Sequence, residues 1–320
     1  MDRETKSSYR LEISATDGFF VASCRVSIEI LDDNDSPPVC ARHTYSVSIH
    51  EDANAGVHLL TVLADDADEG ANAKQEFYLS GEGSDLFSIG RDSGVVSTAL
   101  PLDRETAAAF SLTAHAQDAG MPEWECTSRI DLAVLDVNDN APEWSADSFA
   151  AALKEDAAVG TVATLVAATD PDSGNNRRVS YALLGGGDAS NSFRVDSSSG
   201  VVTLAKPLDR EMRASYNLTV RAMDAGLPRL SSTVSLIVNV LDVNDNPPEF
   251  ASKAYFATVG EDSARGAEVV RVLATSKDEG VNADITYSIV GGNQHRKFKV
   301  IIQQMRFEEK QSVIAISFKG

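Results

Sequence analysis

The residues best placed to do chemistry in this sequence are acids that recur in short motifs. The string Asp-x-Asn-Asp occurs three times, each time followed by proline, and starts at Asp32, Asp136 and Asp242. Two further motifs recur with it: Asp-Arg-Glu starts at Asp2, Asp103 and Asp209, and Glu-Asp starts at Glu51, Glu155 and Glu261. Successive copies are spaced by 104 and 106 residues, except for a first Asp-Arg-Glu spacing of 101. Independent motifs that share one period indicate an array of modules of about 105 residues.

Sorted by their position within this period, the recurring acids gather at three module junctions. The first junction has seven carboxylates: Asp2, Glu4, Asp32, Asp35, Asp66, Asp68 and Asp118. The second has eight: Glu51, Asp103, Glu105, Asp136, Asp139, Asp170, Asp172 and Asp224. The third has six: Glu155, Asp209, Glu211, Asp242, Asp245 and Asp278. Amide side chains join them as Asn34, Asn138, Asn140, Asn244 and Asn246.

This many carboxylates at one junction would repel one another strongly unless cations lie between them. Calcium accepts six to eight oxygen ligands and tolerates bidentate carboxylates and backbone carbonyls. Magnesium takes fewer protein ligands in stricter octahedral geometry, and the absence of His and Cys from these phases argues against zinc. The sequence therefore predicts calcium sites formed by these residues.

The overall charge agrees with this interpretation and excludes other functions. The chain has 48 acids and 28 bases, and its formal net charge of −20 becomes +1 when the 21 junction carboxylates are set aside. Such an acidic chain does not bind nucleic acid by neutralising phosphates. No Ser/His/Asp or zinc-protease spacing occurs, so we expect neither catalysis nor a small-molecule substrate. We also find no run of about 20 apolar residues that would span a membrane, and no apolar signal-peptide core.

The period sets the expected boundaries. Residues 39–142 and 143–248 should be two complete modules, 1–38 the C-terminal part of a preceding one, and 249–320 the N-terminal part of a following one. We interpret Met1 as the edge of a longer coding sequence and not as a natural start. Each module reads as β-structure, because apolar residues alternate with polar ones ahead of each Asp-x-Asn-Asp, as at Ile130, Leu132 and Val134. Several such strands per module predict an antiparallel sandwich.

The complete set of motifs resembles the extracellular repeats of cadherins. It includes Leu102-Asp103-Arg104-Glu105, Asp-x-Asn-Asp-Asn, Asp170-Pro171-Asp172 and Ala222-Met223-Asp224-Ala225-Gly226, and it extends over about residues 1–300. Phe193-Arg194-Val195-Asp196 and Ser199-Gly200-Val201-Val202 are most like the Fat and Dachsous type or the protocadherins. The resemblance implies an all-β chain of tandem seven-stranded Greek-key β-sandwiches joined by calcium-binding linkers, with about three calcium ions per complete junction.

The resemblance also implies individual roles and a function. Glu51, Asp103, Glu105 and Asp139 would surround the outer ions, with Asp136 and Asp172 bridging inward. Asn138, Asp170, Asp172 and Asp224 would hold the ion on the following module's side, and Asn140 and Asn176 would contribute backbone oxygens. The expected function is calcium-dependent cell–cell adhesion. The partners would be other cadherin ectodomains, homophilic or heterophilic. The full-length protein would lie at the plasma membrane with this segment on the extracellular side, and membrane attachment would be only through parts not in this chain. The alternative is a secreted or microbial calcium-stiffened spacer without cell–cell recognition.

Cysteine and asparagine positions give further expectations for an extracellular chain. We predict a disulfide between Cys40 and Cys126, since both belong at the end of their module facing the preceding junction, and we expect Cys24 to be free. Asn217-Leu218-Thr219 is a glycosylation sequon that should face water, whereas Asn34 should stay unmodified because it is a predicted calcium ligand. Trp144 and Phe250 should pack on the top of their own sandwiches.

The sequence departs from the repeat pattern in two places. Ile301 to Phe307 fits no repeat, and the Asp-Arg-Glu due near 313–315 does not appear, so the last module should not complete its sandwich. We attribute this divergent tail, from about residue 301, to a splice form or a gene-model error. In addition, Ser276 stands where the other modules have Asp66 and Asp170. We therefore expect the third junction to bind calcium most weakly.

Overall fold

The computed structural model describes residues 1–184, 191–306 and 311–318. The chain divides into two compact units, which are described separately. The first contains residues 1–139 together with Pro171–Ser173, and the second contains residues 140–170 and 174–320. The short segment Pro171–Ser173 therefore packs with the first unit, which otherwise ends at Asp139.

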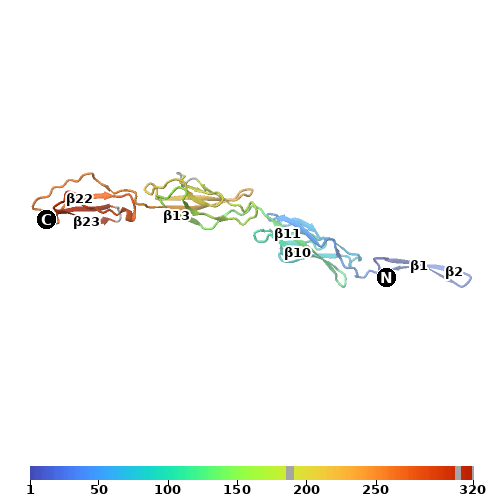
Figure 1. Ribbon diagram of the computed structural model, residues 1–320. Coiled ribbons are helices and arrows are strands. Elements are labelled where there is room, and N and C mark those ends of the chain that lie inside the picture. The colour runs from blue at the N-terminus through green and yellow to red at the C-terminus, as the bar shows by residue number, and fades with distance from the viewer. Residues whose placement is uncertain (185–190, 307–310, 319–320) are drawn as a thin grey trace. The chain divides into compact units, whose positions relative to one another are not determined.

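The first unit opens with a hairpin and continues with a complete sandwich (Figure 1). The hairpin pairs β1 (Ser8–Thr16) with β2 (Val21–Glu29). The sandwich strands are β3 (Val39–Cys40), β4 (Thr44–His50), β5 (His58–Thr61), β6 (Ala64–Asp65), β7 (Gln75–Ser80), β8 (Phe87–Ile89), β9 (Val95–Thr98), β10 (Ala109–Asp118) and β11 (Glu125–Leu135). One sheet has the order β4-β11-β10-β7, the other β5-β9-β8, and β3 pairs with β6.

The connections make this sandwich a Greek key. The chain crosses from the first sheet to the second between β7 and β8 and returns between β9 and β10. Strand β4 runs parallel to β11, whereas β10 pairs antiparallel with both of its neighbours. If β3 with β4 and β5 with β6 are each counted as one interrupted strand, the repeat has the seven expected strands.

The second unit repeats this topology in residues 143–241. Its strands are β12 (Glu143–Trp144), β13 (Ser148–Lys154), β14 (Val162–Leu165), β15 (Ala168–Thr169), β16 (Ser180–Leu184), β17 (Phe193–Val195), β18 (Val201–Leu204), β19 (Ser215–Met223) and β20 (Ser231–Leu241). The sheets are β13-β20-β19-β16 and β14-β18-β17, with β12 paired to β15. The all-β sandwich expected from the sequence is confirmed.

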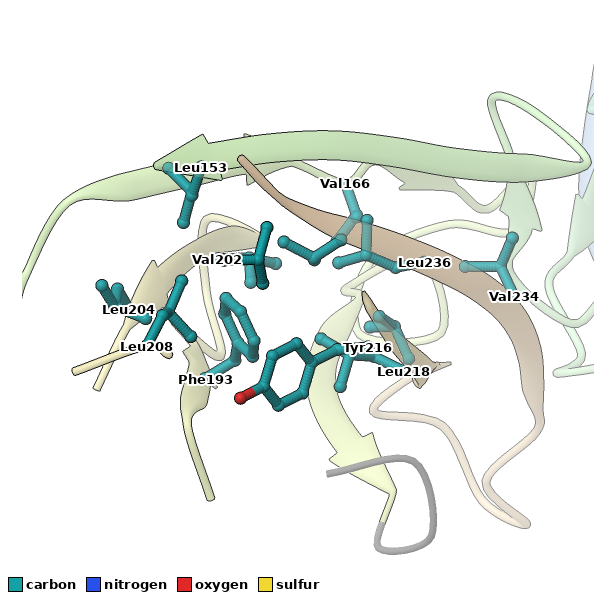
Figure 2. Close-up of a cluster of buried hydrophobic side chains, with 13 residues drawn as sticks. Leu153, Val166, Phe193, Val202, Leu204, Leu208, Tyr216, Leu218, Val234 and Leu236 are labelled. Atoms are coloured by element: carbon teal, nitrogen blue, oxygen red, sulfur yellow. The ribbon is translucent and has the colours of Figure 1, made fainter. Parts of the chain in front are cut away.

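Alternation along the strands builds each core. In β19, Tyr216, Leu218 and Val220 are buried, whereas Asn217 between them is exposed, so the sequon faces water as predicted. Figure 2 shows the Tyr216 and Leu218 side chains meeting residues of the opposite sheet, where the Phe193 and Tyr216 rings pack edge to face with centroids 5.1 Å apart. In the β1–β2 hairpin the same alternation leaves Leu11 and Ile13 about half exposed, at 46% and 49%, because residues 1–38 hold no opposing sheet.

Three local expectations are confirmed. Cys40 and Cys126 form a disulfide with a Cα–Cα distance of 5.7 Å, and Cys24 is free and exposed. Trp144 packs against the core of its own repeat and makes ring contacts with Phe149 and Tyr181. Phe250 likewise packs on Tyr287, with ring centroids 6.1 Å apart. These aromatics therefore pack on their own repeats.

The tail, whose sequence fits no repeat motif, nevertheless forms strands that extend the last sheet. Strands β21 (Glu249–Phe250), β22 (Glu268–Thr275), β23 (Phe298–Arg306) and β24 (Gln311–Phe318) form one sheet. Its order β22-β24-β23 matches β14-β18-β17 of the preceding repeat. β-Branched residues such as Ile301, Ile302 and Val313 favour extended backbone even without the repeat motifs. Phe307 lies outside the described residues. Within 249–306 and 311–318, no counterpart of the sheet β13-β20-β19-β16 is present.

Candidate metal centres at the repeat junctions

Carboxylates that are distant in sequence converge in groups of three, with one oxygen from each lying within 4.8 Å of the others. In the first unit these triads are Glu4–Asp32–Asp68, Glu51–Asp103–Glu105 and Glu105–Asp136–Asp172. In the second unit they are Glu155–Glu211–Asp245 and Glu211–Asp242–Asp278. Every member is a residue that the sequence period selected. The two triads that share Glu105 correspond to the outer and bridging positions expected at the second junction.

Backbone hydrogen bonds fix the acid that follows strand β4. Glu51 is buried, and its two carboxylate oxygens accept the N–H groups of Arg104 and Val137, each at 2.7 Å. Glu155 after β13 makes the same contacts with Arg210 at 2.8 Å and Val243 at 2.7 Å. Each of these acids therefore joins the Asp-Arg-Glu turn to the Asp-x-Asn-Asp linker within one repeat.

The side chain of the first aspartate in each Asp-Arg-Glu motif accepts the backbone N–H three residues later and so closes a local turn. Asp103 accepts the Thr106 hydroxyl at 2.7 Å and the Thr106 N–H at 3.2 Å, and Asp2 has the same two bonds with Thr5. The hydrogen bonds from Thr106 lower the pKa of Asp103, with the hydroxyl having the largest effect. Asp103 therefore stays ionised as a carboxylate beside Glu51 and Glu105.

A second cluster lies on the following repeat's side of the first junction. Asp66 accepts the N–H of Asp68 at 3.0 Å, and the Asn34 amide donates to Asp118 at 3.2 Å. A Cβ on Gly120 would lie 2.2 Å from Asn34 Cγ, so a larger residue there would displace the Asn34 side chain. The predicted set Asn34, Asp66, Asp68 and Asp118 is therefore brought together.

The chemistry of these oxygens fits a hard cation. Asp66 Oδ2, Asp68 Oδ1, Asn34 Oδ1 and Asp278 Oδ2 are buried and accept no hydrogen bond within the described part of the chain. Burial raises the pKa of Asp66, and the nearby Asp68 and Asp118 carboxylates raise it further. Asp139 shows the same effect, with its pKa raised by burial and then by Glu51 and Asp172. A calcium ion would offset the negative charge of these carboxylates and would be contacted by buried oxygens such as Asp66 Oδ2 and Asp68 Oδ1.

The predicted set for the second junction is divided between the two units. Asp172 lies in the first unit with Glu105 and Asp136, and Ser173 donates its N–H to Asp136 at 2.9 Å. Asn138 and Asp139 also belong to the first unit, whereas Asn140, Asp170, Asn176 and Asp224 belong to the second. Asp224 accepts the N–H groups of Gly226 at 3.0 Å and Leu230 at 2.9 Å, which parallels Asp118 in the first unit.

At the third junction, Ser276 reproduces the geometry of the missing aspartate without its charge. Its hydroxyl oxygen accepts the N–H of Asp278 at 3.2 Å, as Asp66 does for Asp68, and donates to the Asn246 carbonyl at 3.2 Å. The Asn246 side-chain amide donates to Asp278 at 3.0 Å. Asp35, Asp139 and Asp245 lie in equivalent tight turns of their own linkers. In each turn the aspartate N–H donates to the carbonyl two residues earlier. The turn survives at this junction with one carboxylate fewer.

Sequence reasoning missed an amide that positions the bridging acid. Asn72 donates to Asp32, and Asn282 donates to Asp242, each at 2.9 Å. Both asparagines stand at the same phase as Asn176, so the period contained the signal. The arginine of each Asp-Arg-Glu motif was also given no role, although it contacts the same acids.

One arrangement contains the residue types of a hydrolytic triad, although the sequence has no such spacing. Ser80 Oγ lies 2.8 Å from His115 Nε2, and His115 Nδ1 lies 3.2 Å from Glu125. The three residues meet through the register of β7, β10 and β11, which linear spacing does not reveal. The Tyr78 ring stacks on His115 at 4.3 Å, and the strand backbone is engaged in ladder pairing, so nothing here forms an oxyanion hole. The cluster is a cross-strand polar contact.

Comparison with known proteins decides the family. The cadherin domain model matches residues 45–135 and 149–241. The chain belongs to the cadherin family. Cadherin repeats are generally calcium-binding and are not enzymes. No helix in the described ranges is long and apolar enough to cross a membrane.

The similar proteins are large membrane cadherins. Over 94% of the chain, identity is 45% with human Protocadherin Fat 1 and 44% with the Drosophila melanogaster Fat-like cadherin-related tumor suppressor homolog. The Drosophila Protocadherin-like wing polarity protein stan is 41% identical. The chain spans only 6% to 9% of the length of these relatives.

Solved structures agree with the fold and the subfamily. The Protocadherin gammaB7 EC3-6 cis-dimer structure matches with a TM-score of 0.79 and 32% identity, covering 95% of this chain and 73% of that one. Mouse Cadherin-23 EC22-24 matches with a TM-score of 0.66 and 28% identity, covering 89% of this chain and 90% of that one. The Fat and protocadherin type of repeat expected from the sequence is confirmed.

Proposed function

We propose that this chain is a calcium-stiffened segment of a membrane-attached adhesion cadherin, exposed on the extracellular side of the plasma membrane. The observation that carries the proposal is the recurrence of carboxylate triads at the junction phases, together with buried oxygens that accept no hydrogen bond. The large membrane cadherins among the relatives support the adhesive context.

The proposed mechanism is neutralisation of charge at each junction. Two carboxylates 4.8 Å apart repel by about 3.5 kcal/mol at an effective dielectric constant of about 20, so a triad such as Glu105–Asp136–Asp172 opposes its own assembly. A calcium ion between the carboxylates would attract each of them and so outweigh their mutual repulsion. At a free calcium concentration about ten times the dissociation constant, each ion would add about 1.4 kcal/mol to the ordered state.

The residues that would hold calcium are those predicted from the period. About three ions per complete junction would use an outer triad, a bridging triad and a cluster on the following repeat's side. The two triads that share Glu105 exemplify the first two at the second junction, and Asn34, Asp66, Asp68 and Asp118 exemplify the cluster at the first. The stiffened repeats would then present a surface to another cadherin ectodomain, either homophilically or heterophilically. Asn217 would carry a glycan on the exposed face of β19.

Calcium titration of the full chain by calorimetry tests the proposal. Asp136→Asn should remove at least one site, because Asp136 belongs to a triad. Asp131→Asn is the matched control, since Asp131 is a half-exposed carboxylate on β11 that pairs with Arg129 at 2.7 Å, accepts the Ser111 hydroxyl at 3.2 Å and is a member of none of the triads above. Equal stoichiometry and affinity in the two variants would contradict the assignment.

Adhesion needs a separate experiment. Beads coated with the full chain should aggregate in calcium and disperse in EGTA if the segment recognises another ectodomain. Binding of calcium without aggregation, either alone or with a Fat-type partner ectodomain, would favour the calcium-stiffened spacer.

A further inference from the structure

The arginine of each Asp-Arg-Glu motif is buried in the same environment three times. The side chains of Arg3, Arg104 and Arg210 are only 9%, 14% and 8% exposed. Each Nε contacts the first aspartate of the Asp-x-Asn-Asp linker: Arg3 with Asp32 at 2.5 Å, Arg104 with Asp136 at 2.5 Å, and Arg210 with Asp242. Each guanidinium also contacts the glutamate next to it in sequence. A buried guanidinium is costly without such partners.

Each of these guanidinium groups also contacts a loop of the following repeat. The three donate to the carbonyl of Ala67 at 3.2 Å, of Pro171 at 2.9 Å and of Lys277 at 2.7 Å, respectively. These three carbonyls directly precede the triad members Asp68, Asp172 and Asp278. Each arginine therefore connects the Asp-Arg-Glu turn of one repeat with the loop of the next that supplies a triad acid.

An additional acid lies beside this guanidinium at two of the three junctions. Glu69 lies 3.2 Å from the Arg3 guanidinium, and Glu279 lies 3.5 Å from that of Arg210. At the second junction the same phase holds Ser173, which cannot form an ion pair. The contact pattern of the arginine is the same at all three junctions, apart from the extra glutamate at two of them. This recurrence points to a specific role and not to an incidental surface ion pair.

We propose that Arg3, Arg104 and Arg210 are fixed cations that tether the loop at 67–69, 171–173 or 277–279 to the preceding repeat whether or not calcium is bound. The guanidinium is planar and forked, so it can hold an aspartate, a glutamate and a main-chain carbonyl at once. The tether keeps one acid of each triad near the other two before any ion arrives. These arginines are positioning residues and touch no ion themselves.

Hydrogen exchange of the full chain in EGTA tests the tether without calcium. Arg104→Gln should speed exchange in the segments 136–139 and 171–173 by about tenfold to a hundredfold, the loss expected for buried hydrogen bonds to a charged group. Arg129→Gln is the matched control, because it removes the same charge from an exposed pair on β11. Exchange in the interior of β10 and β11 reports whether the repeat remains folded.

Two further variants keep the test decisive if Arg104→Gln unfolds its repeat. Arg104→Lys keeps the charge but lacks the fork, so it should loosen 171–173 more than 136–139. Ser173→Glu supplies the acid found at the other two junctions and should slow exchange in 171–173 at least threefold. Exchange within twofold of the parent in EGTA for Arg104→Gln, or for both of these variants, would overturn the proposal.

The outcome is separable from that of the proposed function. If the parent binds no calcium but Arg104→Gln still loosens the loop in EGTA, the tether stands and the calcium proposal fails. If the parent binds calcium and Arg104→Gln exchanges like the parent in EGTA, the tether fails and the calcium proposal stands.

Discussion

Glu51 should stabilise its repeat even without calcium, although it is also a candidate ligand. The residue is only 5% exposed, and its carboxylate accepts two backbone N–H groups at 2.7 Å. A glutamine at this position has one carbonyl oxygen, so either the Arg104 or the Val137 N–H loses its acceptor and the other bond loses its charge-assisted character. An unsatisfied buried donor costs about 1–3 kcal/mol, and the weakened bond about 1 kcal/mol more. Glu51→Gln should therefore destabilise repeat 39–142 by about 2–4 kcal/mol in EGTA.

Native-state hydrogen exchange in EGTA with increasing urea measures this change repeat by repeat. The repeat 143–248 is an internal control, because Glu155 keeps its bonds to Arg210 and Val243 there. Glu155→Gln should give the converse result, with only the second complete repeat destabilised. A change below about 0.5 kcal/mol in the mutated repeat, smaller than a single net hydrogen bond, would refute the structural role.

Four further predictions follow from other features. Replacing Cys40 and Cys126 with serine should lower the unfolding free energy of repeat 39–142 by up to about 4.6 kcal/mol, the loop-closure value for a separation of 86 residues, as measured by urea denaturation. Gly200→Ala should cost more than about 1 kcal/mol in the same assay, because φ is +74° and the new Cβ would lie 2.1 Å from a carbonyl oxygen. Calorimetry of the full chain should show the weakest calcium site at the third junction, and Ser276→Asp should strengthen it. Burial and the nearby Glu51 and Asp172 carboxylates raise the pKa of Asp139, so its ionised form destabilises the ordered junction in EGTA and its protonated form does not. Amide exchange in 136–139, corrected for intrinsic rates, should therefore slow as the pH falls from 7 toward 4.

The acids that share the sequence period lie together in the structure, and several of them are held by local turns. Asp103 closes a turn with Thr106, and Asp66 with Asp68, so each motif carries its own geometry. Strand alternation likewise predicted the buried face of each complete repeat, since the side-chain period of a strand is independent of its neighbours.

The features that sequence reasoning missed all depend on pairing between strands or repeats. The Ser80, His115 and Glu125 contact exists only through the register of three strands. The backbone of β23 and β24 takes repeat positions without repeat motifs, because sheet pairing is satisfied by many sequences. The contact of Arg104 with the Pro171 carbonyl joins residues that are 67 positions apart, which short motifs do not reveal.

Small-angle scattering of the full chain in millimolar calcium and in EGTA tests the central claim most directly. If calcium stiffens the junctions, the pair-distance distribution in calcium should be narrow with one fixed maximum dimension, and EGTA should broaden it. Asp139→Ala in calcium should behave partly like the parent in EGTA, because Asp139 lies among Glu51, Asp103 and Asp172 at the second junction. Identical distributions for the parent in calcium and EGTA, with both complete repeats folded, would contradict the account.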